Sequence, residues 1–437
     1  MMKFGTITAL LATGSALCAS GMAQAAEPTS PPAAAAPTAT QTADEADLAA
    51  AWSEFTGTLG NLTTFLQQHP FYREPENRAA AYAYLTSMMV ARFEEDVIFD
   101  PDFPYFRVLD HRIREGGDNP DQRYLMSIIK GGGTYRVWGK LGTERRLDFQ
   151  IYAGDPFIPN GGRSASFLSS DTLAVASDGS FEVWVSPERH EGNWLENPTD
   201  GNQILVRQIF SDWSKETPGD VHIDRVGHEG DPKPALTERA MAARLRQAAT
   251  DLDRHVRIWP TMVGKRYLGL PPNTLGAASD PGAQGGVPGR FMVNGNFDLA
   301  PDEALIVRAW PMSGNYQGIQ LADPWFSSLE YANRQTSLTA DQSQRSGDGS
   351  YYYVISSRDP GVPNWLDTDG RRRGVILMRF DGMKEKTFDP AKQPVVQKVK
   401  LAALRAKLPK DTPVITPEQR AKALAERRRH VQLRYDN

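Results

Sequence analysis

The sequence predicts an α+β protein that is mainly β: a jelly-roll-like antiparallel sandwich formed from two repeated β units, with an N-terminal helical hairpin. Apolar residues recur every three or four positions over residues 44–69 and 74–93, which is the pattern of one apolar helical face. Short alternating or aromatic runs follow Pro104, separated by Asp-Gly and Gly-rich turns, as in antiparallel strands. A series of landmarks then occurs twice, which indicates the duplication.

The helical and extended segments alternate in blocks along the chain. Pro70 ends the first predicted helix, because proline cannot continue the helical hydrogen bonding. Further helices are expected over residues 236–258 and 416–429. Strands are expected at 135–141, 147–152, 181–185, 204–210, 221–226, 304–310, 351–355 and 375–380.

The first residues predict an export signal. Lys3 supplies a positive start, residues 7–19 are small and apolar, and Ala23-Gln24-Ala25 fits the pattern for cleavage before Ala26. The apolar run is too short to span a bilayer. We therefore expect a signal peptide and a periplasmic or secreted mature chain.

Composition excludes several kinds of chemistry. Cys18 is the only cysteine and lies in the predicted signal, so the mature chain has no disulfide and no thiolate nucleophile. The 49 Lys and Arg nearly balance the 53 Asp and Glu, which provides no field to attract nucleic acid. No later segment is apolar enough to span a membrane. Neither a metal nor a cofactor is expected, because histidines in exposed turns are commoner than a zinc site built from His190, His222 and His228.

The repeat is the strongest signal in the sequence. Asp-Gly-Ser at 178–180 is followed, fifteen residues after its aspartate, by Asn-Trp-Leu at 193–195, and the triplet at 348–350 is followed at sixteen residues by 364–366. Asp-Gly supplies the positive φ that a hairpin turn needs, and asparagine before tryptophan can close a local turn with its side chain. These landmarks predict two copies of one β unit.

Tryptophans extend the match upstream. Arg136-x-Trp138 corresponds to Arg308-x-Trp310, and we expect these indoles, with those of Trp194 and Trp365, to be buried in the two cores. The copies are expected near residues 134–226 and 303–382. The whole chain then divides into a signal peptide (1–25), a disordered Pro/Ala/Thr spacer (26–43), a helical hairpin (44–100), a first β unit (101–230), a helix and Gly/Pro loop linker (231–290), a second β unit (291–390) and a basic helical tail (391–437).

The first copy resembles a known family. Asp-Gly-Ser at 178–180, Asn-Trp-Leu at 193–195 and the strand with Arg207 are similar to the pattern of domain of unknown function 1214. The resemblance covers residues 130–226 well and 303–382 more loosely. The family usually ends in an Arg-x-Tyr strand, whereas this chain has Arg-Gln-Ile-Phe and Arg-Phe. The resemblance implies a jelly-roll-like fold and no established activity, so it supplies no catalytic residues.

One segment concentrates polar groups. Between residues 110 and 124 the chain carries a histidine for proton transfer, arginines for an anion, and a tyrosine. We predict His111, Tyr124 and Asp118 as catalytic residues and Arg112, Arg123, Arg136 and Arg308 as ligand-binding residues, the last two because both copies could line one groove. The alternative is a salt-bridged crossing between the helices and the sheet. Segments absent from the repeat, 107–124 and 271–290, are favoured as site candidates over repeated motifs.

Three functions remain open at this point. The protein could bind a small amphipathic or carbohydrate-like ligand between its β units. It could be a cofactor-free hydrolase or lyase with a His/Tyr/Arg site. It could also be a structural envelope protein without a small-molecule site. A deep pocket with shifted pKa values would favour an enzyme, and a shallow aromatic groove would favour binding.

Overall fold

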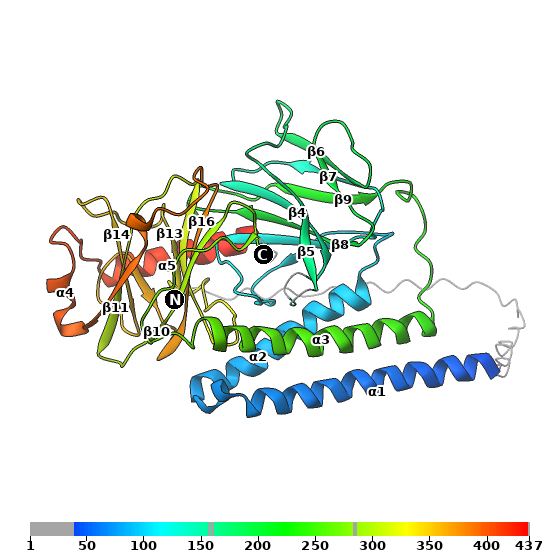
Figure 1. Cartoon of the computed structure of the whole chain (residues 1–437), viewed down its shortest axis with the longest axis horizontal. Helices are drawn as coiled ribbons and strands as arrows, with labels where there is room; N and C mark the ends of the chain where they lie inside the picture. The colour runs from blue at the N-terminus through cyan, green and yellow to red at the C-terminus, as the bar shows by residue number, and fades with distance from the viewer. Residues whose placement is uncertain (1–38, 156–157, 159–160, 283–285, 436–437) are drawn as a thin grey trace, which may run out of the picture. The chain divides into compact units, whose positions relative to one another are not determined.

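The computed structural model describes residues 39–155, 158, 161–282 and 286–435 (Figure 1). The predicted signal peptide lies outside these residues, as does most of the predicted spacer. Residues 39–43 of that spacer belong to the first helix instead. From Asp44 onward the chain forms one compact unit. Among the described residues, no helix has both the length and the apolar character that a membrane span needs.

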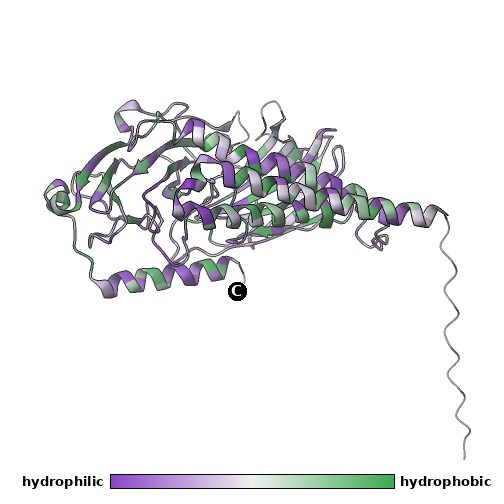
Figure 2. Cartoon of the chain, turned by 90° about the horizontal axis from the view of Figure 1, so that it is seen from below, coloured by the Kyte–Doolittle hydropathy of each residue, from purple (hydrophilic) through white to green (hydrophobic). Residues whose placement is uncertain are grey.

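Long helices pack together on one side of the β units. They are α1 (Ala39–Gln68), α2 (Pro75–Arg92) and α3 (Glu238–Arg266), with the short elements η1 (Pro70–Arg73) and η2 (Phe93–Ile98) around α2. Pro70 and Pro75 each occupy a helix start, where a missing N–H costs nothing. Thr237 caps α3 by accepting a hydrogen bond from the N–H of Ala240. Hydrophobic and hydrophilic residues are interleaved along these helices (Figure 2), as expected when only one face is buried.

The first β unit consists of two sheets. One sheet has the strand order β1-β2-β8-β4-β5, and the other has the order β7-β6-β3-β9. All pairs are antiparallel except β6 with β7. The strands are β1 (Arg107–Leu109), β2 (Gln122–Ile128), β3 (Tyr135–Lys140), β4 (Arg146–Gly154), β5 (Gly162–Ser169), β6 (Ser180–Ser186), β7 (Trp194–Glu196), β8 (Gly201–Ile209) and β9 (Asp220–Arg225).

The second β unit has the same topology. Its sheets have the orders β10-β16-β12-β13 and β15-β14-β11-β17, again with one parallel pair, β14 with β15. Each strand of the second unit thus has a counterpart at the same place in a sheet of the first unit, and β1 alone is left without one. The strands are β10 (Phe291–Asp298), β11 (Glu303–Ala309), β12 (Tyr316–Ala322), β13 (Ser337–Thr339), β14 (Tyr351–Ser356), β15 (Trp365–Asp367), β16 (Arg373–Asp381) and β17 (Val395–Lys400).

Each unit is a sandwich with its own core. We call the sheets containing β8 and β16 the inner sheets and those containing β6 and β14 the outer sheets. Alternate residues of each pair interdigitate, such as Val183 with Val206 in the first unit and Tyr353 with Met378 in the second. The predicted class, mainly β with a sandwich and an N-terminal helical hairpin, is confirmed.

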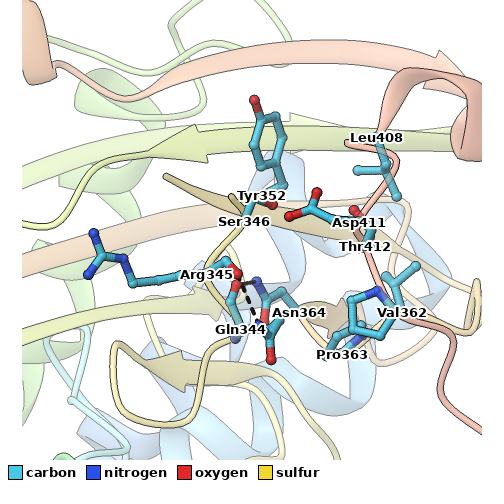
Figure 3. Close-up of a pocket in the computed structure, with 11 residues that line it drawn as sticks. Gln344, Arg345, Ser346, Tyr352, Val362, Pro363, Asn364, Leu408, Asp411 and Thr412 are labelled. Carbon is cyan, nitrogen blue, oxygen red and sulfur yellow. Dashed lines mark hydrogen bonds between the residues drawn. The ribbon is translucent and has the colours of Figure 1, made fainter. Parts of the chain in front are cut away.

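Shared local contacts support the predicted duplication. The side chain of Asn193 bonds both the N–H and the C=O of Ala174, at 2.8 Å each. Asn364 bonds the N–H and the C=O of Gln344 in the same way, at 2.7 Å each (Figure 3). In both units the aspartate of the Asp-Gly-Ser triplet accepts hydrogen bonds from the serine N–H and hydroxyl.

The predicted burial of the four tryptophans is correct only for Trp365, which is 7% exposed. Trp138, Trp194 and Trp310 are half-buried. The outward face of the first outer sheet carries Arg136, Trp138, Glu182, Trp184, Trp194, His222 and Asp224. The alternation of residues in the sequence predicts which side chains share a face of the sheet. It does not predict whether other parts of the chain cover that face, which is why the burial of these tryptophans was predicted wrongly.

The proposed equivalence of Trp138 with Trp310 is also out of register. Trp138 lies opposite Glu182, four residues after the aspartate of the first triplet. At the matching place in the second unit, Arg308 lies opposite Tyr352. Trp138 therefore corresponds to Arg308, two residues before Trp310.

The C-terminal segment covers the second outer sheet. Helix α4 (Leu404–Lys407) and the following turn place Leu404 and Leu408 in one cluster with Val354 and Trp365. The hollow beside this turn (Figure 3) encloses about 10 Å³, which is room for about one water.

Helix α5 (Pro417–Arg434) follows. Its Arg420 stacks on Trp365, and its Val431 packs in one cluster with Phe210, Trp213 and Tyr331. Arg427, in the basic helical tail, is only 5% exposed and donates to the C=O groups of Tyr331 and Ser337. Its guanidinium lies 4.5 Å from the centre of the Trp213 ring, and this stacking explains why the charge is tolerated there.

Candidate functional site

A cavity of about 780 Å³ lies between the two inner sheets and the helices. One wall is the face of β2 and β8 that points away from the sandwich core. A second wall comes from β10 and β16, a third from η2 and α3, and the loop at 115–118 closes one side. Both segments favoured by the sequence, 107–124 and 271–290, contribute residues to this lining.

The sheet walls carry two arginines at corresponding positions. Arg207 on β8 lies opposite Tyr124 on β2, and Arg379 on β16 lies opposite Met292 on β10. Arg207 donates to the Oε1 of Gln150 at 2.6 Å and to the hydroxyl of Tyr152 at 2.8 Å.

Arg379 also meets neutral acceptors. It donates to the Oε1 of Gln320 and to the C=O of Gly117. Both arginine side chains are almost fully buried, with 5% of Arg207 and 6% of Arg379 exposed.

A third arginine in the lining is neutralised. Arg290 forms two hydrogen bonds of 2.6 Å with the carboxylate of Asp381, and Asp381 is fully buried. Burial raises the pKa of Tyr124, and the positive charges of Arg379, Arg207 and Arg290 oppose that rise. The Tyr124 hydroxyl therefore lies within electrostatic range of all three guanidinium groups.

The loop that closes the cavity depends on two glycines. Gly116 and Gly117 both have positive φ, at 66° and 67°. A Cβ on Gly117 would come within 2.6 Å of the Phe326 ring. This close packing lets the loop cross between the two units and positions Asp118, whose carboxylate accepts hydrogen bonds from the N–H and hydroxyl of Ser328.

The helical wall is rich in carboxylates. Arg92 pairs with Glu95 at 2.7 Å and with Glu115 at 3.2 Å. Asp96 lies next to this pair, and burial raises its pKa to about 7, with further contributions from the negative charges of Asp251 and Glu95. Burial also raises the pKa of Glu95.

One further polar pair lines the cavity. The Nε2 of His255 on α3 lies 2.6 Å from the Oδ2 of Asp155, just after β4. Among the described residues, no group of three or more histidine, cysteine or carboxylate side chains is arranged to hold a metal ion. The apolar part of the lining is formed by Leu109, Met126, Ile128, Leu205, Trp259, Met262, Met292 and Phe326.

Two of the predicted catalytic residues reach this cavity. Tyr124 and Asp118 line it. His111 is exposed outside it, with its ring 6.2 Å from that of Tyr435. Their roles stay predictions.

The four predicted ligand-binding arginines lie elsewhere. Arg112 is exposed and pairs with Asp110, and Arg123 donates to Gln208. Arg136 and Arg308 lie on the outward faces of the outer sheets, beside Trp138 and Trp310. Segment 110–124 is also bonded to the second β unit, since the Tyr316 hydroxyl on β12 accepts a hydrogen bond from Asn119 and donates one to Asp121.

Sequence reasoning missed the helical wall. Asp96, Asp251 and His255 are ordinary members of helical segments, and no spacing pattern connects them with one another. Arg207 and Arg379 were visible as the arginines of the repeated strand, but repeated features were assigned to the fold. The signal that could have found them is a charge in the middle of an otherwise apolar strand.

The fold and the cavity define a class: two β sandwiches with the same strand order and a cavity between them. Residues 129–211 match the model of the family described as "Protein of unknown function (DUF1214)", which confirms the resemblance noted for the first unit. A solved structure of an uncharacterised protein from Burkholderia cenocepacia is similar at 29% identity, with a TM-score of 0.76, over 82% of this chain and 99% of that one. A protein from Vibrio parahaemolyticus matches at 14% identity and a TM-score of 0.43, over 73% of this chain and 98% of that one. No curated protein matches the chain.

Proposed function

We propose that this protein binds a small amphipathic molecule in the cavity between its two β units. The observation that carries this proposal is the cavity itself, because about 780 Å³ falls within the range of about 300–1,000 Å³ that small-molecule sites occupy. Its lining combines an apolar part, which suits the body of such a molecule, with many charged and polar side chains, which suit a polar end.

The arrangement of the lining favours a ligand with two unlike ends. Met126 and Leu205 face each other across β2 and β8, and Tyr124 and Arg207 form the next cavity-facing pair on the same two strands. Apolar and polar contacts therefore follow one another along a single strand face. A molecule with an apolar body and a polar end matches this order.

The proposed place of action is outside the cytoplasm. Support comes from Lys3, the apolar run and the Ala-Gln-Ala pattern at the N-terminus. Mass spectrometry of protein recovered from the periplasmic fraction should give a chain that starts at or near Ala26. A full-length chain recovered only from the cytoplasm would contradict export.

Calorimetric titration with decanoate and with decanol tests the binding proposal. At least one of these two probes should bind saturably to the protein. Leu205→Trp should weaken that binding about tenfold or more, because the indole fills the apolar part of the cavity. Val395→Trp is the matched control, because Val395 is 51% exposed on β17 and lies outside the lining. Absence of binding by both probes, or equal loss in both variants, would contradict the proposal.

A hydrolase or lyase acting in the same cavity is the second candidate function. Asp96 favours it, because a carboxyl group with a pKa of about 7 can both donate and accept a proton near neutral pH. Turnover of p-nitrophenyl decanoate should then fall about 100-fold or more in Asp96→Asn while the probe still binds. Hydrolysis at the same rate in both proteins would rule out this role.

A further inference from the structure

Two buried arginines in the cavity form no ion pair with any described carboxylate. Arg207 and Arg379 donate only to amide, hydroxyl and carbonyl oxygens, and no described carboxylate lies within ion-pair distance of either. A buried charge is costly when no opposite charge accompanies it. At longer range the carboxylates of Asp118 and Asp121 act on Arg379, and that of Asp148 acts on Arg207. Each of these carboxylates is already bonded elsewhere, Asp118 by Ser328, Asp121 by Tyr316 and Asp148 by Arg146.

Other buried arginines of the protein have an interaction that stabilises their charge. Arg290 is paired with Asp381 at 2.6 Å, and Arg146 is paired with Asp148 at 2.7 Å. Arg427 has no acidic partner but stacks on the Trp213 ring. Among the described residues, Arg207 and Arg379 have neither a carboxylate at ion-pair distance nor an aromatic ring to stack on.

The two guanidinium groups also retain donors. Each contributes one N–H from each terminal nitrogen to the contacts described, whereas a guanidinium has five N–H groups. Both arginines line the cavity, and both act electrostatically on the Tyr124 hydroxyl. An anion bound in this cavity near Tyr124 is therefore attracted by both of them.

We propose that the ligand carries an anionic head group, and that Arg207 and Arg379, one from each β unit, bind this group together. Carboxylate, sulfate and phosphate monoester share the oxygen geometry that a guanidinium fork recognises. The apolar body then extends from the arginines past Leu205 and Met126. This inference rests on the proposed binding function and specifies its ligand class.

The two arginines occupy corresponding positions in the two β units. Strands β8 and β16 occupy the same place in two similar inner sheets, and both inner sheets border the cavity. One arginine at one repeated position therefore provides two cations around a single hollow.

The test compares three probes with one tail: decanoate, decyl phosphate and decanol. In calorimetric titrations the unmodified protein should bind at least one of the two anions about tenfold or more tightly than decanol, as charge-assisted hydrogen bonds require. A preference shared by both anions identifies charge as the recognised property, and a preference for one identifies the shape of its head group. Arg207→Gln and Arg379→Gln should each lose most of this preference while decanol affinity and melting temperature are maintained. Arg136→Gln, on the outward face of the first outer sheet, should leave the preference unchanged.

The outcomes separate this inference from the binding proposal. Equal affinity for decanol and both anions, or an unchanged preference in both glutamine variants, would overturn the anionic head group and leave the binding function intact. Failure of all three probes would contradict the binding function itself. If a glutamine variant does not fold, Arg207→Lys keeps the charge without the fork and should retain part of the preference.

Discussion

The two outer sheets share a topology but not a surface. In the first unit the outward face is open and carries Trp138 and Trp184, with His222 stacked on the first at 4.4 Å and His190 on the second at 4.1 Å. In the second unit the same face carries Ile306, Val354 and Trp365 and is covered by the C-terminal segment, including Leu404 and Leu408.

The difference shows that cover, rather than topology, determines which side chains a sheet can carry. On the open face each indole N–H has a polar partner: Asp224 for Trp138, Glu182 for Trp184 and Ser186 for Trp194. Amphipathic rings suit a surface that is half in contact with water. On the covered face Val354 takes the place of Trp184, because a desolvated polar group would cost stability there. Trp365, in the place of Trp194, keeps its indole but donates the ring N–H to the C=O of Ser356.

The largest expected effect contrasts the two repeated tryptophans. Trp365→Ala should reduce the free energy of unfolding by about 3–5 kcal/mol, because it empties a buried site under Arg420. Trp194→Ala should cost roughly 1–2 kcal/mol, since its side chain is only partly buried. Urea denaturation measures both values. Equal losses would show that the cover on the second unit adds no stability.

A smaller effect is expected from the covering segment. Leu404→Ala should cost about 2–4 kcal/mol, because Leu404 is 3% exposed and packs on the second outer sheet. Leu433→Ala is the matched control on α5, where the side chain is 46% exposed, and should change stability by less than about 0.5 kcal/mol. If both variants are neutral, the segment is not packed in solution.

The smallest effect concerns the open face. Arg136 and Glu182 form an ion pair whose side chains are 42% and 40% exposed. A double-mutant cycle with alanine at both positions should give a coupling below about 1 kcal/mol, and added salt should reduce it further. A larger coupling that resists salt would mean that this face is covered in solution.

Much of the fold followed from periodicity, and the failures have physical causes. Strands with clear alternation, such as β3 and β14, were predicted within a few residues. Strand β10 was missed because Asn294 and Asn296 interrupt it, and their side chains bond Tyr267 and the loop before the strand instead of entering a core. Sequence alternation also could not show that α4 and the turn after it cover only one of two similar outer sheets.

The candidate site was predictable only in part. Tyr124 and Asp118 were found because polar groups cluster in one stretch of sequence. Arg207 and Arg379 were passed over because chemistry was expected to need an asymmetric constellation. The cavity lies between the two β units, so residues on β8 and β16 converge on it, and only the arrangement of the units in space reveals this.

The raised pKa of Asp96 couples folding to the uptake of a proton. Its pKa is about 7 in the folded protein against an ordinary value of 3.8, so between about pH 4 and pH 7 the folded chain holds a proton that the unfolded chain has released. The stability that this proton contributes is complete below about pH 4 and disappears as the pH rises through 7, at up to about 1.4 kcal/mol per pH unit. Asp96→Asn carries no such proton, so its stability should rise relative to the unmodified protein between pH 5 and pH 8 in urea titrations. Parallel pH profiles would show that Asp96 ionises normally. If they diverge, the folded protein exchanges a proton with solvent near neutral pH through a residue that borders its cavity.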